Sequence, residues 1–492
     1  MKNSTSYIDT IAKALPAMKP FKFLCVTLTG KNKMMNQNGK YLKTILLAGI
    51  ALFATHLPAA ESRPNVLFFF CDDQRADTIA ALGNPVIKTP NLDRLARQGV
   101  AFNRAYMQGG FTGATCVPSR AMLLSGQSLF HVDTALQRDE AWPAAFGKAG
   151  YTTFISGKWH NGQKSVPLNF QIGRSLFIGG MSKNPLHDDV QDLVNGRLSA
   201  PRPAGQHLCA AFADATAQFI REHKGGPFFC YVPFDGPHDP HIVPKDFPVH
   251  YDPAKIPLPA NFLPEHPFNN GEMKIRDELL LPHPRPPAKV QAMNADYYRY
   301  ISYLDMLMGQ VIAALEKSPH AKNTIIVFSA DSGVARGSHG LIGKQNLYEH
   351  SVRVPLIIAG PGIPAGKRTE AMCYLYDLLP TLGALCRVPA PPKSEGNDFS
   401  AVLRDPGKPG RTELVFAYKG VQRAITTGEW KLIQYPKVNQ TQLFNLQYDP
   451  HEKNNLADRQ PARVKEMAAL LQKKLAEAGD NKPLRNDDAA KK

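Results

Sequence analysis

Apolar runs alternate with helical periodicity over most of the chain. The first run, Asn65–Cys71, is almost entirely hydrophobic and stops at Asp72-Asp73, as expected for a strand buried on both faces of a parallel sheet. Similar runs occur at Thr152–Ser156, Pro227–Pro233, Thr324–Ser329 and Val354–Ala359. Helical patterns separate them, at Asn91–Gln98, His207–His223 and Asp296–Leu315. This alternation predicts an α/β fold whose large, mostly parallel central sheet is flanked by helices.

The pattern changes after about residue 408, where short strands follow one another closely. They are Glu413–Lys419, Gln422–Thr427, Trp430–Tyr435 and Gln442–Leu446. Turn-forming dipeptides separate the first three strands, and a helical pattern covers Pro461–Ala478. We therefore expect a larger domain at residues 61–407 and a smaller C-terminal subdomain at residues 408–492, formed by a four-stranded antiparallel sheet plus a helix.

A Pro-rich segment, Pro237–Pro287, interrupts the larger domain and has no clear periodicity. Structureless segments of this length inside a compact domain are uncommon unless they serve a function. We expect this loop to cover a substrate cleft.

The N-terminal region carries the basic, apolar and small-residue zones of a secretory signal peptide. Thr44–Leu57 is apolar, Lys40 and Lys43 precede it, and Pro58-Ala59-Ala60 follows. The apolar stretch is too short to span a bilayer comfortably. Residues 1–60 are therefore predicted to be a leader, with residues 1–33 arising from a start codon placed too early and a signal peptide at about 34–60. An uncleaved anchor is the alternative; cleavage would leave a periplasmic or secreted protein without stable membrane insertion.

The net charge of +16 is partly a property of this leader. Residues 1–60 contain eight Lys and one acidic residue, so the remainder has 50 basic and 41 acidic residues, a net charge of +9. No long Lys/Arg run remains, which favours an anionic substrate at least as much as a nucleic acid, and we expect no nucleic-acid partner. The remaining cysteines have no paired spacing, so no disulfide framework or zinc motif is predicted.

Acidic residues follow two of the predicted strands. Asp72-Asp73 ends the first run and Asp331 follows Asn323–Ala330. Open α/β sheets bind ligands at the carboxyl ends of their strands, and converging carboxylates require a counter-charge. Oxygen-only ligation suits Ca²⁺ or Mg²⁺. Helix capping is the alternative explanation for any one of these aspartates.

The segment Cys116-Val117-Pro118-Ser119-Arg120 is predicted to begin a helix, with Pro118 in its first turn. Cys116 would lie at the helix N-terminus, which favours anions, and Arg120 would lie on the same face one turn later. A guanidinium there could hold an anionic nucleophile and an oxygen of an anionic substrate together. A lone Cys near an Arg is, however, more often a buried structural thiol.

These motifs, taken in order, resemble the type I sulfatases of the alkaline phosphatase superfamily. The match covers nearly the whole presumed mature chain and rests on Arg63-Pro64-Asn65 leading to Asp72-Asp73, Thr89–Ala96, Cys116–Arg120, Gly157–His160, Pro237–Pro240, Asp331–Gly333 and Gly340–Lys344. It implies a catalytic sulfatase domain at residues 61–407 and oxidation of Cys116 to formylglycine by a formylglycine-generating or sulfatase-maturating enzyme. It also implies a metal site, with Ca²⁺ expected and Mg²⁺ as the alternative, formed by Asp72, Asp73, Cys116, Asp331 and Ser332. The family usually has Asn or His at the last position, so Ser332 is a departure that puts this ligand in doubt.

The resemblance also assigns roles in sulfate ester cleavage. The hydrated aldehyde of residue 116 attacks sulfur, activated by the metal and Arg120, with Asp331 as proton acceptor. His238 and Lys344 protonate the departing alcohol and hold the sulfate, Lys158 stabilises oxyanion charge, and His160 takes the proton that releases sulfate. Substrate-binding residues are therefore expected to be Arg120, Lys158, His238 and Lys344.

The expected substrate is a sulfated carbohydrate, such as a polysaccharide fragment, or an aryl sulfate, by analogy with the family. Two alternatives stay open. The same catalytic groups could hydrolyse phosphate or phosphonate esters, and a chain with a degraded metal site could be a non-catalytic binder of sulfated glycans.

Overall fold

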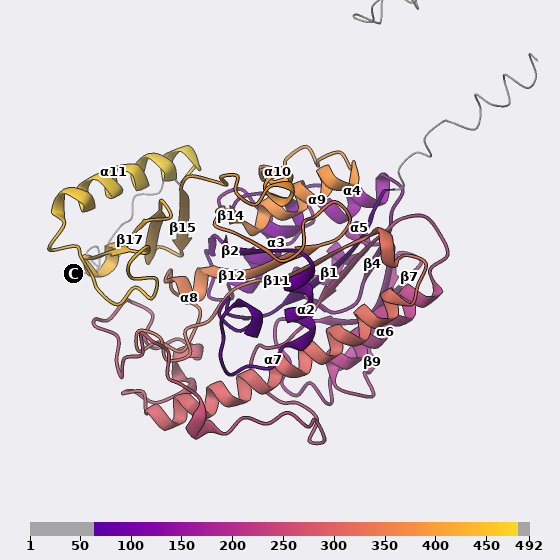
Figure 1. Cartoon of the computed structure of the whole chain (residues 1–492), viewed down its shortest axis with the longest axis horizontal. Helices are drawn as coiled ribbons and strands as arrows, with labels where there is room; N and C mark the ends of the chain where they lie inside the picture. The colour runs from indigo at the N-terminus through magenta and orange to yellow at the C-terminus, as the bar shows by residue number, and fades with distance from the viewer. Residues whose placement is uncertain (1–62, 481–492) are drawn as a thin grey trace, which may run out of the picture. The chain divides into compact units, whose positions relative to one another are not determined.

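The computed structural model describes residues 63–480, so the predicted leader lies outside the described residues. Within this range no helix is long and apolar enough to cross a membrane. The described chain forms two sheets with helices packed around them (Figure 1).

The large sheet contains the five apolar runs predicted from the sequence, and the α/β prediction is confirmed. Its strands follow the order β13 (Lys367–Thr369), β2 (Val100–Tyr106), β12 (Arg353–Ala359), β11 (Thr324–Ala330), β1 (Asn65–Cys71), β10 (Phe228–Pro233), β4 (Thr152–Ile155), β6 (Ile172–Ile178), β7 (Asp189–Val194) and β8 (Arg197–Leu198). The run from β11 to β6 is parallel, whereas β12 and β7 are antiparallel to their neighbours β11 and β6. The sheet is therefore mixed at both edges. The short strands β5 (Lys158–Trp159), β9 (Arg202–Pro203) and β14 (Cys373–Tyr374) pair with β6, β7 and β2.

Strand β1 lies inside the sheet because every one of its side chains is apolar or paired. Alternate residues point to opposite faces of a strand. Val66, Phe68 and Phe70 join the core beneath α3 (Cys116–Ser125), α4 (Trp142–Lys148) and α9 (Leu378–Cys386). The intervening side chains join the core beneath α2 (Pro90–Gln98), α6 (Leu208–Glu222) and α7 (Pro287–Glu316). In Figure 1, α4 and α9 lie above the strands and α6 and α7 below them. Three short helices also lie in this part of the chain: α5 (Val166–Asn169), α8 (Glu349–Val352) and α10 (Ser400–Arg404).

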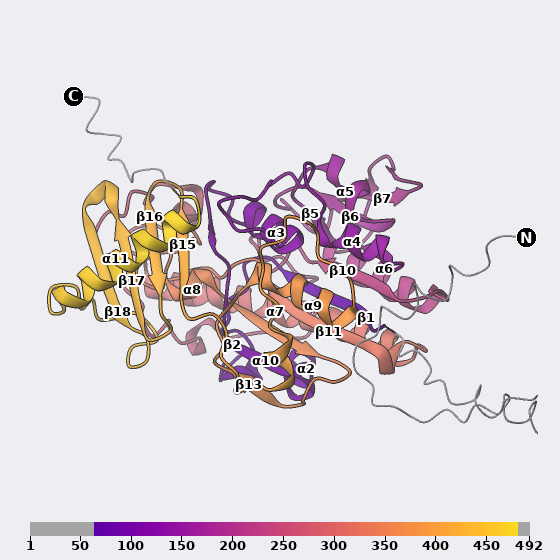
Figure 2. The same cartoon turned by 90° about the horizontal axis from the view of Figure 1, so that it is seen from above.

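The small sheet contains the four predicted antiparallel strands, and the helix predicted after them is also present. Its order is β18 (Gln440–Asn445), β17 (Trp430–Tyr435), β16 (Gln422–Thr426), β15 (Leu414–Tyr418) and β3 (Gly109–Gly110), and α11 (Pro461–Glu477) covers one face through Met467, Leu471 and Leu475 (Figure 2).

The fifth strand, β3, pairs in parallel with β15 and was not predicted. Gly109 has φ of 117°, and a β-carbon there would lie 2.0 Å from the carbonyl oxygen of Ala417. Only glycine fits this approach. The small sheet is thereby joined by hydrogen bonds to the segment that leads to Cys116.

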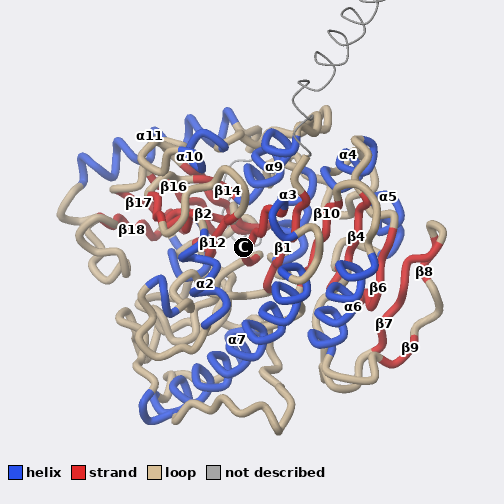
Figure 3. Tube along the Cα trace, turned by 45° about the vertical axis from the view of Figure 1, so that its right-hand side comes forward, coloured by secondary structure: helices blue, strands red, loops and turns tan. Residues whose placement is uncertain are grey.

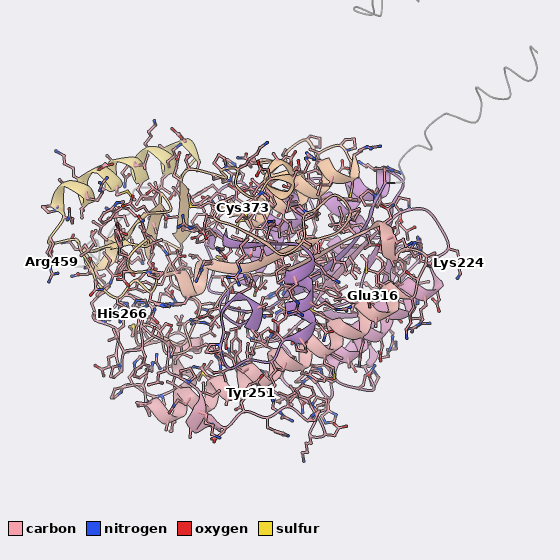
Figure 4. The ribbon with its side chains drawn as sticks, in the orientation of Figure 1. Lys224, Tyr251, His266, Glu316, Cys373 and Arg459 are labelled. Atoms are coloured by element: carbon pink, nitrogen blue, oxygen red, sulfur yellow. The ribbon has the colours of Figure 1, made fainter. Side chains whose placement is uncertain are left out.

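The Pro-rich loop runs between β10 and α7 and contains only the 3₁₀ turns Pro253–Lys255 and Arg276–Leu280 (Figure 3). Helix α7 begins at Pro287, rather than at the predicted Asp296, because proline suits the first helical turn. Tyr251 in the loop hydrogen-bonds Ser302 of α7 at 2.7 Å, and Figure 4 shows Tyr251 beside this helix.

A buried histidine at the N-terminus of α6 is expected to make the folded protein less stable at acidic pH. Nδ1 of His207 accepts a hydrogen bond from the backbone N–H of Cys209, and its Nε2 donates to the carbonyl of Ile242, so the ring is neutral. Burial lowers the pKa of His207 to about 4, against the raising effect of the Ile242 hydrogen bond and from an ordinary value of 6.5. Because the unfolded chain takes up the proton first, stability present above pH 6.5 is lost as the pH falls toward 4.

We expect His207 alone to lower the free energy of unfolding by about 2 kcal/mol when the pH falls from roughly 7.5 to 5. Urea unfolding at both pH values measures the loss. His207→Asn keeps an accepting oxygen at the cap but does not titrate, so it should show a smaller loss. An equal loss in the wild type and the variant would contradict the assignment.

Candidate active site

The site is built where β1 and β11 end side by side. Cys71 is paired with Ala330 in the parallel register, so the residues that follow, Asp72-Asp73 and Asp331, meet at one edge of the sheet. The backbone N–H of Asp73 donates to Oδ1 of Asp331 at 3.1 Å. Asp73 has φ of 61°, in the left-handed region, which turns the chain sharply at this point. All three side chains are buried.

Arg120, one turn into α3, bridges two of these carboxylates. Its Nη2 donates to Asp72 Oδ2 at 3.0 Å and its Nε donates to Asp331 Oδ2 at 2.9 Å. The preceding residue, Ser119, donates from Oγ to the backbone carbonyl of Asp331 at 2.6 Å, which fixes the helix against the strand end. Nη1 of Arg120 is buried and has no hydrogen-bond partner among the described residues. This donor is available to a ligand.

Two lysines complete the cationic half of the site. Nζ of Lys344 lies 2.6 and 2.8 Å from the two carboxylate oxygens of Asp73. Lys158, on β5, donates to Oδ2 of Asp72 and lies 3.4 Å from Oδ1 of Asp235. Burial alone would lower the pKa of each lysine, but the neighbouring carboxylates raise both. Both ammonium groups are therefore charged and directed into the site.

Cys116 lies at the start of α3 and faces His160. Its Sγ is 3.1 Å from Nδ1 of His160. Burial raises the pKa of Cys116 to about 11, although Lys344 and Lys158 act in the opposite direction. Burial and then Lys158 lower the pKa of His160 to about 3. The pair is thus an uncharged thiol and a neutral imidazole, so Cys116 is not prepared to act as a thiolate nucleophile.

His238, in the loop after β10, lies close to Asp73. Its Nε2 is 3.6 Å from Oδ2 of Asp73, and its Nδ1 is 2.8 Å from the carbonyl oxygen of Asp239. Because a carbonyl only accepts, Nδ1 is the donor and Nε2 faces the site. Ser332 donates from Oγ to Oδ1 of Asp73 at 2.8 Å.

The donor set fits a hard divalent cation. Ligand atoms of Asp72, Cys116 and Asp331 lie within 4.8 Å of one another, as do those of Asp72, Asp73 and His238. Oδ1 of Asp72 is buried and has no hydrogen-bond partner among the described residues. Burial would raise the pKa of Asp72, but Lys158 and Arg120 outweigh it and lower the pKa, so this carboxylate is ionised. Burial and the charge of Asp72 raise the pKa of Asp331 to about 6. Converging oxygen ligands of this kind suit Ca²⁺ or Mg²⁺.

The structure brings together every site residue expected from the sequence, from six separate segments of the chain. One further residue joins them, the buried Asp235, which lies two positions after the end of β10. The signal that identified Asp72 and Asp331, an acid after an apolar strand, was present there too. His339 and Glu349 lie outside this group: His339 stacks on Tyr348, and Glu349 pairs with Lys431 of β17 at 2.9 Å. In residues 63–480 the cysteines are all unpaired, as expected.

The protein is thus an α/β protein that gathers paired carboxylates and buried cations at the ends of the strands of a mixed sheet. The family model described as Sulfatase matches residues 64–388, more than half of the chain, and the chain therefore belongs to the sulfatase family. A second model, described as N-sulphoglucosamine sulphohydrolase, C-terminal, matches residues 337–481. The protein is a sulfatase enzyme, and its family implies a metal and formylglycine.

Among curated relatives, the chain is 28% identical over 453 residues to an ulvan-active sulfatase of Formosa agariphila, covering 85% of this chain and 82% of the relative. It is 25% identical over 524 residues to an N-acetylglucosamine-6-O-sulfatase of Bacteroides thetaiotaomicron, covering 89% and 91%. A solved structure in complex with its substrate D-glucosamine-2-N,6-O-disulfate matches with a TM-score of 0.70 at 24% identity, covering 86% of this chain and all of that one. The phosphonate monoester hydrolase of Agrobacterium radiobacter matches with a TM-score of 0.69 at 22% identity, covering 85% and 96%. The two structural matches show the fold alone.

Proposed function

We propose that this sulfatase removes sulfate from a sulfated carbohydrate, using formylglycine made from Cys116 by a separate maturation enzyme. The observation that carries the proposal is the position of Cys116. It begins a helix, lies beside two strand-end carboxylates and faces a neutral histidine, yet its own thiol has a raised pKa. Cys116 therefore has the position of a nucleophile, but its thiol is poorly activated. This combination favours conversion of the residue to another nucleophile.

The proposed metal ligands are the carboxylates of Asp72, Asp73 and Asp331, together with residue 116 and Ser332. We propose Ca²⁺, with Mg²⁺ as the alternative, because the carboxylate ligands are hard oxygen donors. When bound, the cation supplies Lewis-acid stabilisation of negative charge. Ser332 contributes at least through its hydrogen bond to Asp73, which holds that carboxylate in place.

The remaining residues bind the sulfate group and move protons. The unpartnered Nη1 of Arg120 and the ammonium groups of Lys158 and Lys344 would hold the sulfate oxygens. In the overall reaction the bond between sulfur and the ester oxygen breaks, water is consumed, and an alcohol and inorganic sulfate are formed. His238, when protonated on both ring nitrogens, would give the alcohol its proton from Nε2, and His160 would take a proton from residue 116 so that sulfate is released.

The substrate class is supported by the relatives, whose names specify ulvan and N-acetylglucosamine-6-O-sulfate chemistry. The excess of basic residues beyond residue 60 suits an anionic polymer. We also propose a periplasmic or secreted location, on the basis of the signal-peptide pattern before residue 61.

The function predicts a preference for sulfate over phosphate esters. We expect an aryl sulfate to be turned over at least about 100-fold more efficiently than the matching aryl phosphate, since the chain belongs to the sulfatase family and about 3 kcal/mol of differential transition-state binding gives this ratio. The measurement is kcat/KM for both esters, followed by release of sulfate from glucosamine sulfates and ulvan fragments. A preference for the phosphate or a phosphonate ester would assign the enzyme to that chemistry instead. Binding of sulfated glycans without any turnover by the mature enzyme would indicate a non-catalytic binder.

A further inference from the structure

Asp235 is a fourth buried carboxylate in the site, and neither the proposed metal ligands nor the proton-transfer residues include it. It follows β10 and is only 3% exposed. Its Oδ1 lies 3.4 Å from Nζ of Lys158 but has no hydrogen-bond partner among the described residues. Within residues 63–480 the structure pairs Asp235 with no cation other than Lys158. Burying an ionised carboxylate destabilises the folded protein unless a cation or a hydrogen-bond donor balances its charge.

The backbone fixes Asp235 next to Lys158. Gly157, which precedes Lys158, packs against the end of β10, where a β-carbon would lie 2.1 Å from the carbonyl oxygen of Pro233. On the other side of Asp235, the carbonyl of Gly236 accepts the backbone N–H of Asp72 at 3.0 Å. Asp235 is thus held between the strand that carries Asp72 and the segment that carries Lys158.

Several positive groups compete for the carboxylate of Asp72. Its Oδ2 accepts from Arg120 and from Lys158, while its Oδ1 is the buried oxygen with no hydrogen-bond partner. A bound divalent cation would be coordinated by the same carboxylate. Lys158 is fully buried, so it cannot move its charge into water, and two cations on one carboxylate oxygen repel each other.

We propose that Asp235 is a positioning residue that takes the ammonium of Lys158 when a divalent cation occupies the site, and so leaves Asp72 free to ligate it. The distances make this a small movement, because Nζ of Lys158 already lies between the two carboxylates. Asp235 then acts on cation affinity through Lys158. This inference rests on the metal of the proposed function, but not on the identity of the sulfated substrate.

A double-mutant cycle on cation binding tests the proposal. The mature enzyme is freed of divalent cations by chelation and dialysis, and Ca²⁺ and Mg²⁺ are titrated calorimetrically into wild type, Asp235→Asn, Lys158→Met and the double variant. We expect Asp235→Asn to weaken cation binding about tenfold in the presence of Lys158, but less than about twofold in the Lys158→Met background, because residues in contact show such coupling. Asn is the same size as Asp; if that variant does not fold by circular dichroism, Asp235→Ser replaces it in the cycle.

Equal weakening in both backgrounds would overturn the proposal, since it would mean that the charge of Asp235 acts through space and not through Lys158. Unchanged affinity in Asp235→Asn would overturn it as well. Failure of the wild type to bind either cation would overturn both this inference and the metal of the proposed function. A failure confined to the substrate, seen as turnover of phosphate but not sulfate esters, would leave the cation cycle intact and is therefore distinguishable.

Discussion

Replacing Cys116 with alanine is expected to abolish sulfate ester hydrolysis while leaving the protein folded. The side chain is only 2% exposed and lies at the first position of α3, and its Sγ makes one polar contact, with His160. Alanine keeps the helix and removes the atom from which the nucleophile is made. Loss of a nucleophile typically lowers kcat by about 10³-fold or more, and the remaining charged groups cannot replace it. Turnover of an aryl sulfate, measured beside the far-ultraviolet circular dichroism spectrum, checks both parts of this expectation.

Cys386→Ala is the matched control, because Cys386 is another buried, unpaired cysteine, at the end of α9. It should retain activity close to that of the wild type. Mass spectrometry of the peptide containing residue 116, from protein made in its native host, should show the mass of formylglycine in place of cysteine. An unmodified thiol in fully active enzyme would refute the proposed nucleophile, and so would wild-type activity in Cys116→Ala.

Among the proposed variants, Arg120→Met is expected to give the largest decrease in the free energy of unfolding. It should also lower the activity. Arg120 is 1% exposed and joins Asp72 to Asp331 through two hydrogen bonds. Methionine fills similar space but leaves two buried carboxylates without this counter-charge. Removing one partner of a buried ion pair costs about 3–5 kcal/mol. Loss of a donor to the developing charge should also lower kcat by about 100-fold or more.

Guanidinium-chloride unfolding with and without Ca²⁺ measures the stability change. Because the cation supplies part of the missing positive charge, Ca²⁺ should stabilise Arg120→Met more than it stabilises the wild type. Arg94→Met is the control. Arg94 forms a partly exposed ion pair with Glu316, the last residue of α7, which is labelled in Figure 4. Its replacement should lower the free energy of unfolding by less than about 1 kcal/mol. A loss for Arg120→Met no larger than that of Arg94→Met would show that the guanidinium does not neutralise the strand-end carboxylates.

The hydrophobic pattern predicted the central strands of the large sheet and the four antiparallel strands of the small one, because strand β1 and its neighbours are apolar on both faces and turn residues separate the strands after residue 408. Strands β2, β6 and β7 of the large sheet were not predicted. The antiparallel direction of β12 was not predicted. The run at Val354–Ala359 has the same apolar content as a parallel strand, yet it pairs antiparallel to β11, because pairing depends on where the connection returns the chain.

Two further features were not predicted from the sequence. Strand β3 consists of two glycines, which carry no periodicity, and its pairing with β15 depends on an approach that only the folded backbone creates. Asp235 had the same strand-end signal as Asp72, but an acid after a strand is also a common cap. Its contact with Lys158 depends on the packing of Gly157 against Pro233.

The sequence by itself determined the α/β class, the order of the motifs and the residue types that sulfate chemistry needs, because periodicity and strand ends are local properties of a chain. Only the tertiary structure decided which charges are paired. Arg120 spans Asp72 and Asp331, Lys344 takes Asp73, and Lys158 lies between Asp72 and Asp235. These contacts join residues 48 to 271 positions apart in the chain. Electrostatic energy depends on distances of a few ångströms, and these are set by the packing of β1, β10 and β11 against α3, not by spacing along the sequence.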